Sequence, residues 1–306
     1  MKTLSHNQIR TWRNCKRQYG FGYVQLRVPR KTPTPLLVGR SWDDCLQEWW
    51  QGEGAQDRLL RAAKVAMHEG DPFARAKLCA MLIGYSAMWG DVPCRLIATQ
   101  VEFTVPIVHP VTGAVHPECN LTGFIDAVAE IDGRLVVVES KSSGEDITLG
   151  SAFWRRVAVM DPQVSTYLPA ARALGYDVRD CIYDVARKPE LRPKKDETPD
   201  AFQERIVLDM HARPEWYFQR QTLVRLEREE REHALDVWHF ADEIVSASRT
   251  GRYPRNPDQC QKFGRACDYA PVCAGEASLD DPHLFKDAAK RERKDNAGTN
   301  SARPAA

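Results

Sequence analysis

Long apolar segments are missing from this chain of 306 residues. No run approaches the roughly 20 consecutive apolar residues that a membrane-spanning helix needs. Residues 1–6 lack the apolar core of a signal peptide. We therefore expect no membrane partner and no export, and we expect a cytoplasmic protein.

The sequence also lacks the phosphate-binding loop Gly-x4-Gly-Lys-Ser/Thr and any convincing internal repeat. An ATP-driven motor is therefore not expected. Hydrophobic residues make up 43% and charged residues 28% of the chain, which is ordinary for a globular protein. A chain of this length buries a sizeable core, so we expect one domain with excursions or two small domains.

Acidic residues are absent from residues 1–40, although the net charge of the whole chain is only +1. Basic residues occur throughout this segment, with Trp12, Tyr19, Phe21 and Tyr23 between them. This pattern suits a nucleic-acid strand, because phosphates bind the charges and bases stack on the rings. It suits equally well a solvated basic face whose aromatic side chains fill the core. The candidate DNA contacts are Arg10, Arg13, Lys16, Arg17 and Tyr19.

Nine cysteines occur in a chain without an export signal, so we expect free thiols or metal ligands instead of disulfides. One cysteine stands alone near the start, and three lie within fourteen residues in the pattern Cys-x6-Cys-x5-Cys. Four thiolates hold either a 4Fe-4S cluster or a Zn²⁺ ion, and the spacing does not separate the two. The alternative is four unrelated reduced thiols. The candidate ligands are Cys15, Cys260, Cys267 and Cys273.

Hydrophobic periodicity predicts an α/β chain in which helices come first and a strand-rich segment follows. Ser5 is the expected N-cap of a basic helical segment over residues 5–28. Gly175 fits the C-cap of a helix over residues 161–174. Further helices are expected over residues 36–50, 55–69, 72–90 and 227–249. Strands are expected over residues 95–108, 121–131, 134–141, 178–186 and 215–226.

Asp132-Gly133 separates two strand-like runs and is a strong hairpin signal. In a two-residue turn, Ile131 pairs with Arg134. Counting outward from that pair places Asp126 directly opposite Glu139. Directly opposed side chains on one face have Cβ atoms about 5 Å apart. The hairpin therefore predicts two carboxylates that face each other.

Two opposed carboxylates repel each other strongly unless a cation lies between them. Their oxygens suit Mg²⁺ or Mn²⁺, and such an ion would polarise a phosphodiester and lower the pKa of a bound water. Lys141 projects from the same face as Glu139, where its ammonium would orient that water or offset charge on the phosphorane. The alternative is an exposed, salt-bridged sheet face. Apolar runs beside both acids favour a buried site, since a charge at the end of a buried strand usually has a role or a partner.

Gln163 and Tyr167 lie four residues apart, so they share one face of the helix predicted after the hairpin. There they would hydrogen-bond a phosphate or a metal-bound water. The alternative is a partly exposed helix face.

Three short motifs occur in a fixed order: Gly123-x-x-Asp126, Glu139-x-Lys141 and Gln163-x3-Tyr167. In this order they resemble the PD-(D/E)XK nuclease superfamily. One cysteine before this core and three after it make the chain similar to the iron–sulfur branch of the RecB-like exonucleases, which includes AddB, CRISPR-associated and bacteriophage enzymes. The resemblance covers roughly residues 5–275. It implies a restriction-endonuclease-like α/β core, with a central mixed sheet flanked by helices, an N-terminal helical insertion and a C-terminal segment bound to a metal cluster.

The resemblance implies that Asp126, Glu139 and the carbonyl of Ser140 bind Mg²⁺ or Mn²⁺. Lys141 would be the catalytic lysine, and Gln163 and Tyr167 would assist at the active site and on DNA.

Two further acids stand where the family places metal ligands. Asp43 lies four residues after Gly39, at a position where the family usually has a histidine. Glu102 lies at the start of the first predicted strand. Either acid would complete the metal site.

The resemblance also favours a 4Fe-4S cluster over Zn²⁺ for the four cysteines. Many relatives begin the C-terminal trio with Cys-x2-Cys, whereas six residues separate Cys260 from Cys267. This spacing weakens the similarity to the CRISPR-associated enzymes.

These features together predict a metal-dependent DNA exonuclease that acts on single strands or DNA ends and leaves a 5′-phosphate. By analogy, it would serve recombination, repair or replication in a bacterium or a phage-infected host, with a recombinase or helicase as candidate partner. One alternative is a DNA-end-binding scaffold that keeps the fold and the cluster but does not cleave. Another is a zinc-stabilised regulator in which the motifs are coincidental.

The expected domain boundaries follow from these motifs. A basic helical region with the first cluster cysteine precedes the nuclease core, and a cysteine-rich segment and a disordered tail follow it. The respective ranges are residues 1–94, 95–226, 227–280 and 281–306.

Overall fold

The computed structural model describes residues 1–30, 34–262 and 264–288. The chain groups into two compact units. The first comprises Met1–Pro33, Ile107–Asn120 and Leu235–Ala306, and the second comprises Thr34–Pro106 and Leu121–Ala234. This grouping differs from the expected boundaries at residues 94, 226 and 280, because segments far apart in the sequence join one unit.

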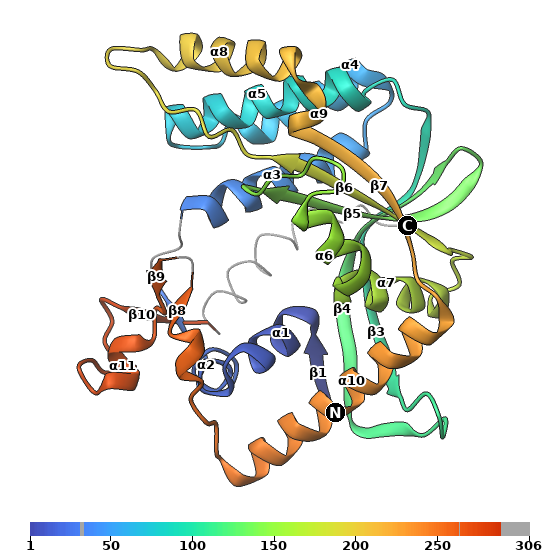
Figure 1. Cartoon of the computed structure of the whole chain (residues 1–306), viewed down its shortest axis with the longest axis vertical. Coiled ribbons are helices and arrows are strands. Elements are labelled where there is room, and N and C mark those ends of the chain that lie inside the picture. The colour runs from blue at the N-terminus through green and yellow to red at the C-terminus, as the bar shows by residue number, and fades with distance from the viewer. Residues whose placement is uncertain (31–33, 263, 289–306) are drawn as a thin grey trace, which may run out of the picture. The chain divides into compact units, whose positions relative to one another are not determined.

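A mixed β-sheet organises the fold (Figure 1). Its strands are β1 (Lys2–Ser5), β3 (Cys94–Val108), β4 (Val115–Ile131), β5 (Arg134–Ser143), β6 (Asp180–Arg187) and β7 (Phe218–Val224). Their order is β1-β4-β5-β6-β7, and β3 also pairs with β4. β5 and β6 are parallel, whereas β4–β5 and β6–β7 are antiparallel. The strands predicted around residues 95–108, 121–131, 134–141 and 178–186 are therefore confirmed.

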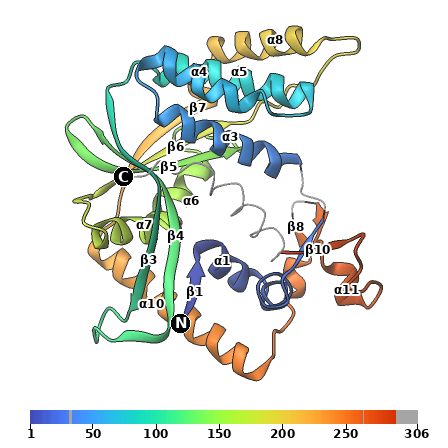
Figure 2. The same ribbon diagram turned by 180° about the vertical axis from the view of Figure 1, so that it is seen from behind.

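Helices of the second unit cover both faces of this sheet (Figures 1 and 2). One face is covered by α3 (Thr34–Trp50), α4 (Gly54–Ala66), α5 (Pro72–Trp89) and α8 (Pro199–Ala212). The opposite face is covered by α6 (Ala152–Met160) and α7 (Pro162–Ala173), and the short α9 (Pro214–Tyr217) leads into β7. The predicted α/β fold with a mixed sheet between helices is confirmed. Among the described residues, no helix is both long and apolar enough to cross a membrane.

Large aromatic side chains fill the layer between α3 and the sheet. Trp42, Leu46 and Trp49 recur at helical spacing along α3 and are at most 3% exposed. They belong to one core cluster with Ala127 and Ala129 of β4, whose small side chains leave room for the indoles. Burying each large apolar side chain contributes roughly 1.5–3 kcal/mol, so this cluster anchors α3 against the sheet.

The valines of β5 alternate between the two layers. Val136 and Val138 pack with the α3 layer, whereas Val137 packs with Val164 and Leu168 of α7. Both faces of β5 are therefore buried, as the run of valines predicts. Glu139 and Lys141, which follow these valines, therefore lie at the end of a strand that is buried on both faces.

The turn between β4 and β5 forms as predicted. Asp132 and Gly133 both adopt left-handed backbone conformations, with φ of 52° and 72°, as a two-residue type I′ turn requires. The ladder runs from Ile131 opposite Arg134 to Ala127 opposite Val138. In this register the next pair is Asp126 and Glu139.

The N-terminal segment of the first unit is helical but interrupted. Ser5 caps α1 (His6–Asn14) in a capping box with Gln8. The helical segment predicted over residues 5–28 is confirmed as far as Val24 but is interrupted, because Cys15 is extended (φ −156°, ψ 110°) between α1 and α2 (Lys16–Tyr19). A π-helical turn (Gly20–Val24) and β2 (Arg27–Pro29) follow.

The C-terminal part begins with α10 (Glu227–Thr250), which confirms the long helix predicted there. The elements that follow are a 3-10 turn (Pro257–Gln259), β8 (Gln261–Lys262), β9 (Arg265–Ala266), α11 (Ala270–Ala274) and β10 (Phe285–Asp287). The disorder expected over residues 281–306 is wrong for residues 281–288: Phe285 is 3% exposed and stacks on Tyr269, and β10 pairs with β2. Residues 289–306 lie outside the described part of the chain.

Candidate active site

The hairpin brings its two carboxylates together at the end of β4 and β5. Asp126 accepts a hydrogen bond at Oδ2 from the backbone N–H of Ser140, at 2.9 Å. Glu139 is 1% exposed, and its Oε1 accepts a hydrogen bond from Nζ of Lys141. Its other oxygen, Oε2, is buried without a hydrogen-bond partner. The site therefore contains a buried carboxylate oxygen that still needs a partner.

Both acids are held where a negative charge is costly. Burial raises the pKa of Glu139 to about 8, with the charge of Asp126 adding to the effect and Lys141 opposing it. Burial also raises the pKa of Asp126, against Lys141 and the Ser140 amide. A cation between the two acids would relieve both penalties.

Asp43 of α3 joins this pair. Asp43 reaches solvent, but the protein around its carboxyl group removes part of its hydration. This loss of hydration, and then the charge of Asp126, raise the pKa of Asp43 to about 7. One turn earlier on α3, a Cβ added to Gly39 would lie 3.5 Å from Oγ of Ser142 and 3.7 Å from Nζ of Lys188. The first half of α3 thus passes the end of β5, which places Asp43 beside the carboxylates.

Gln163 and Tyr167 of α7 also lie at the site. Nε2 of Gln163 donates a hydrogen bond to the hydroxyl of Tyr167 at 3.1 Å. Tyr167 is 7% exposed, and burial followed by the charge of Glu139 raises its pKa. Its ring meets Phe103 edge-on at 5.8 Å. The pair is therefore held together, with the phenol close enough to Glu139 to sense its charge.

Asp161 is a site residue that the sequence interpretation missed. Its Oδ1 accepts a hydrogen bond from the backbone N–H of Gln163 at 2.8 Å and so caps α7. Its Oδ2 accepts a hydrogen bond from the hydroxyl of Tyr183 at 2.7 Å. Tyr183 lies opposite Glu139 in the β5–β6 ladder. The Asp-Pro pair that opens α7 was the available signal, because Asp followed by Pro is a typical helix start.

Glu102 is not brought into this group. Its side chain is exposed on β3, whereas the neighbouring Phe103 is 1% exposed and packs on Tyr167. Successive strand residues point to opposite faces, so Glu102 points away from Tyr167. The expectation that Glu102 completes the metal site is not supported.

The donor set of Asp126 and Glu139 fits a hard divalent cation. In the described part of the chain, no three His, Cys, Asp or Glu side chains converge as a complete metal site. Mg²⁺ does not require one, because it keeps several waters and binds through one or two carboxylates plus substrate phosphate. The unpartnered Oε2 of Glu139 is the oxygen that such an ion would satisfy.

The family model of the PD-(D/E)XK nuclease superfamily matches residues 3–274. This chain belongs to that superfamily. Nucleases of this superfamily generally use Mg²⁺ or Mn²⁺, and the family implies DNA as the substrate. The match shows the superfamily and does not assign a branch within it.

Two solved structures are among those similar to this nuclease. SSO0001 is 15% identical with a TM-score of 0.38, covering 90% of this chain and 88% of that chain. A candidate exonuclease from Eubacterium rectale is 12% identical with a TM-score of 0.46, covering 92% and 90%. With TM-scores under 0.5, these likenesses carry no weight for the function. No curated protein matches the chain.

The four candidate cluster cysteines of the nuclease share one neighbourhood in the first unit. Burial raises the pKa of Cys267 and of Cys273, and in both cases the thiols of Cys15 and Cys260 raise it further. The backbone N–H of Cys267 donates to the carbonyl of Cys260 at 2.8 Å. The thiols are thus near enough to interact electrostatically, although among the described residues they do not converge as a metal site.

The aromatic residues of the N-terminal segment pack in the core. Tyr19 is 6% exposed, and its ring contacts Tyr23 and Tyr253. This burial matches the alternative interpretation, in which the rings fill the core and do not stack on bases.

The basic residues of the same segment differ in their surroundings. Lys16 forms a salt bridge with Glu243 at 2.9 Å, and Nε of Arg17 donates to the carbonyl of Tyr253 at 2.8 Å. Arg10 and Arg13 are exposed. Of the candidate DNA contacts, these two arginines are the most accessible.

Proposed function

We propose that this nuclease is a metal-dependent DNA exonuclease whose centre is Asp126 and Glu139. The observation that carries this proposal is the buried, unpartnered Oε2 of Glu139, in a carboxylate close enough to Asp126 for the two charges to interact. Asp126, Glu139 and the carbonyl of Ser140 would hold Mg²⁺ or Mn²⁺, with Asp43 as a further ligand. When bound, the ion polarises the phosphodiester and lowers the pKa of the attacking water.

Lys141 acts as a charged hydrogen-bond donor and not as a base. Burial disfavours its charge, but the carboxylates of Glu139 and Asp126 outweigh burial and raise its pKa. The ammonium therefore keeps its proton at Nζ. It donates to Glu139 in this structure, and with substrate present it would donate to the attacking water or to a phosphate oxygen.

Gln163 and Tyr167 position the phosphate beside this lysine. The raised pKa of Tyr167 keeps its hydroxyl protonated, so it offers a hydrogen to an oxygen acceptor. In the hydrolysis, the water oxygen bonds to phosphorus and the bond from phosphorus to the 3′-oxygen breaks. The attacking water loses one proton to solvent, and the 3′-oxygen takes one proton from solvent as it leaves. The fragment released carries a 5′-phosphate.

Digestion of end-labelled DNA with Mg²⁺ or Mn²⁺ tests the proposal. The Lys141→Ala variant should lose roughly 100-fold or more in rate, as expected when a transition-state donor is removed. Lys64→Ala, which removes an exposed lysine of α4, is the matched control and should digest DNA at the wild-type rate. Wild-type protein that binds DNA ends but never cleaves them would favour the scaffold alternative.

A comparison of linear and circular single strands, with 5′ and 3′ labels, tests the exonuclease part. Exonuclease action predicts loss of the linear strand while the circle survives. Cleavage of the circle would make the enzyme an endonuclease. A role in bacterial or bacteriophage recombination, repair or replication, with a helicase or recombinase partner in the cytoplasm, rests on the family resemblance alone.

We also propose that Cys15, Cys260, Cys267 and Cys273 bind a 4Fe-4S cluster, with Zn²⁺ as the alternative. Their mutual electrostatic effect supports a shared site. Anaerobically purified protein should contain iron and absorb visible light, and Cys273→Ala should lose both, whereas Cys79→Ala should lose neither. Protein that contains zinc without iron would favour the alternative. Protein that contains neither metal would contradict the proposed cluster site.

A further inference from the structure

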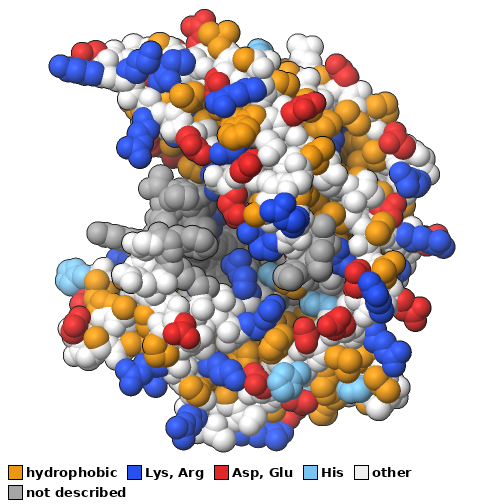
Figure 3. All heavy atoms as spheres, viewed as in Figure 1, with side chains coloured by type: hydrophobic (Ala, Val, Ile, Leu, Met, Phe, Trp, Pro, Cys, Tyr) orange, Lys and Arg blue, Asp and Glu red, His pale blue; other side chains and the backbone are white. Residues whose placement is uncertain are grey.

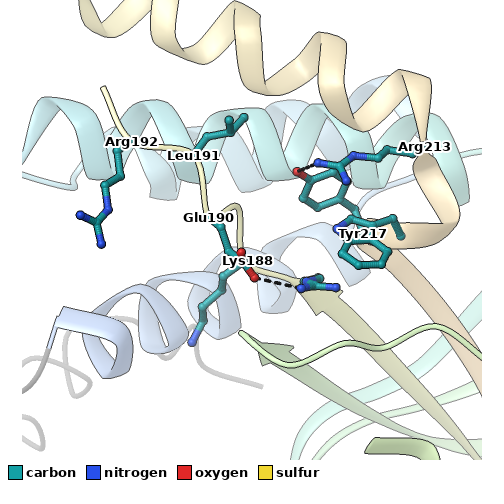
Figure 4. Close-up of a pocket in the computed structure, with 8 residues that line it drawn as sticks. Lys188, Glu190, Leu191, Arg192, Arg213 and Tyr217 are labelled. Carbon is teal, nitrogen blue, oxygen red and sulfur yellow. Dashed lines mark hydrogen bonds and ion pairs between the residues drawn. The ribbon is translucent and has the colours of Figure 1, made fainter. Parts of the chain in front are cut away.

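A second concave site lies in the same unit as the carboxylates, where β6 ends and the loop to α8 begins. It has a volume of about 430 Å³ (Figure 4). The side chains come from the end of β6, the following loop and α9. The lining residues are Arg187, Lys188, Glu190, Leu191, Arg192, Arg213, Trp216 and Tyr217.

Arginine and lysine dominate the charged lining, and Glu190 is the one acid among the lining residues. Arg187 is only 7% exposed, and its guanidinium lies 3.9 Å above the ring of Trp216. Its Nη2 pairs with Glu190 at 2.9 Å. Its Nη1 is buried without a hydrogen-bond partner and lies 3.7 Å from the exposed Asp146. The guanidinium of Arg187 is therefore held between Trp216 and two acids, and its Nη1 keeps a donor that no hydrogen bond uses and that an anion replacing Asp146 would take up.

The other wall of the site is also fixed. Arg213 forms two hydrogen bonds with Asp209, at 2.9 and 2.8 Å. Its guanidinium lies 5.4 Å from the ring of Trp216 and 5.4 Å from that of Tyr217. Trp216 thus contacts two guanidinium groups, so it orients the arginines and is not left open for base stacking.

Lys188 connects this site to the carboxylates. It lines the pocket, and its side chain points toward α3 in Figure 4. Burial lowers its pKa, while the charge of Asp43 raises it. Its backbone N–H donates to the carbonyl of Ser143, at the end of β5, at 2.7 Å. One lysine therefore lies beside both Asp43 and the pocket.

Positive charge continues outward from the pocket along the loop to α8. Arg192, Lys194 and Lys195 are exposed there, and Figure 3 shows Lys and Arg side chains gathered over this loop. Besides burial, the charge of Arg192 lowers the pKa of Lys77, so the two cations repel each other. Within the described ranges, no salt bridge neutralises Arg192. An anion is the missing complement of this surface.

We propose that this pocket binds a backbone phosphate of the DNA strand next to the phosphate that is cleaved. Arg187, Arg192 and Lys188 supply the donors, and Trp216 holds Arg187 in its plane. Phosphate is the anion that suits a planar guanidinium fork. This proposal rests on the proposed nuclease function, because Lys188 joins the pocket to the carboxylates. The phosphate is either a terminal 5′-phosphate or an internal diester.

Binding of a 3′-labelled oligothymidine in EDTA tests the pocket without cleavage. Arg192→Ala and Arg187→Ala should each raise Kd roughly 5- to 10-fold and reduce the salt dependence by about one phosphate contact. In digestion with Mg²⁺, the same variants should raise KM and leave kcat nearly unchanged. Arg179→Ala, an exposed arginine before the opposite end of β6, is the control and should bind like wild type.

The results separate the sources of the phosphate. A loss confined to the 5′-phosphorylated strand identifies the terminal phosphate, and an equal loss with a 5′-hydroxyl strand identifies an internal diester. Arg192 is exposed, so Arg192→Ala should fold and keeps the test valid if Arg187→Ala does not. If both variants bind DNA with wild-type affinity, the pocket does not bind a DNA phosphate, even if the enzyme cleaves DNA. If the variants bind DNA more weakly but the wild-type protein never cleaves it, the phosphate pocket would stand and the nuclease function would be contradicted.

Discussion

Glu139 has the surroundings least suited to its charge among the acids of the site. Burial and Asp126 raise its pKa to about 8, from an ordinary value of 4.5. Because the folded-state pKa lies above the unfolded one, the metal-free protein binds a proton more tightly when folded. That stabilisation is complete below about pH 4.5 and is lost as the pH rises through 8.

Glu139→Gln should remove this pH dependence, because Gln stays neutral at every pH. The melting temperature of the metal-free variant, relative to wild type, should therefore rise between pH 5 and 8, by at least about 2 °C. Thermal unfolding in EDTA at both pH values measures it. Glu204→Gln, at an exposed position of α8, should show no such trend. A constant difference between Glu139→Gln and wild type would mean that Glu139 is not held in a raised-pKa state.

Residue types alone identified Asp126, Glu139 and Lys141 as a group, since a local turn determines their register. Asp43 was reached through the family resemblance, because no local pattern joins a helix residue to a strand more than eighty positions later. Lys188 was missed for the same reason, whereas Asp161 was missed although the Asp-Pro pair at the start of α7 was a readable signal. The prediction that Glu102 completes the metal site is not supported, because alternation along β3 points its side chain away from Tyr167.

At the level of elements, the β4–β5 hairpin determines whether the carboxylates meet. Its register depends on a turn in which Gly133 has φ of 72°. A one-residue slip would move Asp126 or Glu139 to the other face of the sheet.

Gly133→Ala should lower the free energy of unfolding by about 1–2 kcal/mol, because a Cβ is strained in the left-handed region. Denaturant unfolding measures the loss. Gly144→Ala is the matched control, since no positive φ occurs there and an added Cβ meets no atom within 4 Å. Equal stability of the two variants would show that the turn does not control the hairpin.

Helix α7 depends on its N-cap residue, Asp161, which also holds the backbone of Gln163 in position. Asp161→Ala should cost about 1–2 kcal/mol of stability and also lower kcat, because Gln163 and Tyr167 lose their fixed start. Asp161→Asn keeps a capping oxygen, so its losses of stability and of kcat should each be less than half those of Asp161→Ala. Unfolding and digestion rates measured on both variants check this. A stable Asp161→Ala variant with the wild-type rate would contradict the role of the cap.

Helices α6 and α8 were missed because charged residues interrupt their apolar positions. In α8, Phe202, Ile206 and Met210 are fully buried at a spacing of four residues, which was a readable signal. The break at Cys15 had no such signal, since the segments on both sides of it are helical.

For the whole molecule, the order of the motifs along the chain predicted the superfamily, and the strand and helix pattern predicted the α/β core. The grouping into two units was not predictable from a linear division. Residues from the start, the middle and the end of the chain form the first unit. Contacts between such distant segments leave no periodic pattern in the sequence.

The net charge of +1 likewise conceals where the cations lie. The loop before α8 carries exposed basic residues beside a concave site, although the sequence drew attention to the N-terminal segment instead. Several N-terminal aromatic residues are buried, so the loop is the stronger candidate for contact with a strand.

Crystals of the protein grown with Mn²⁺ give the most direct test of the metal site, through the anomalous scattering of the ion. A peak shared by the carboxylates of Asp126 and Glu139, and absent from the Glu139→Gln variant, is the predicted result. A map with no peak there, or with manganese bound only elsewhere, would contradict the proposed catalytic centre.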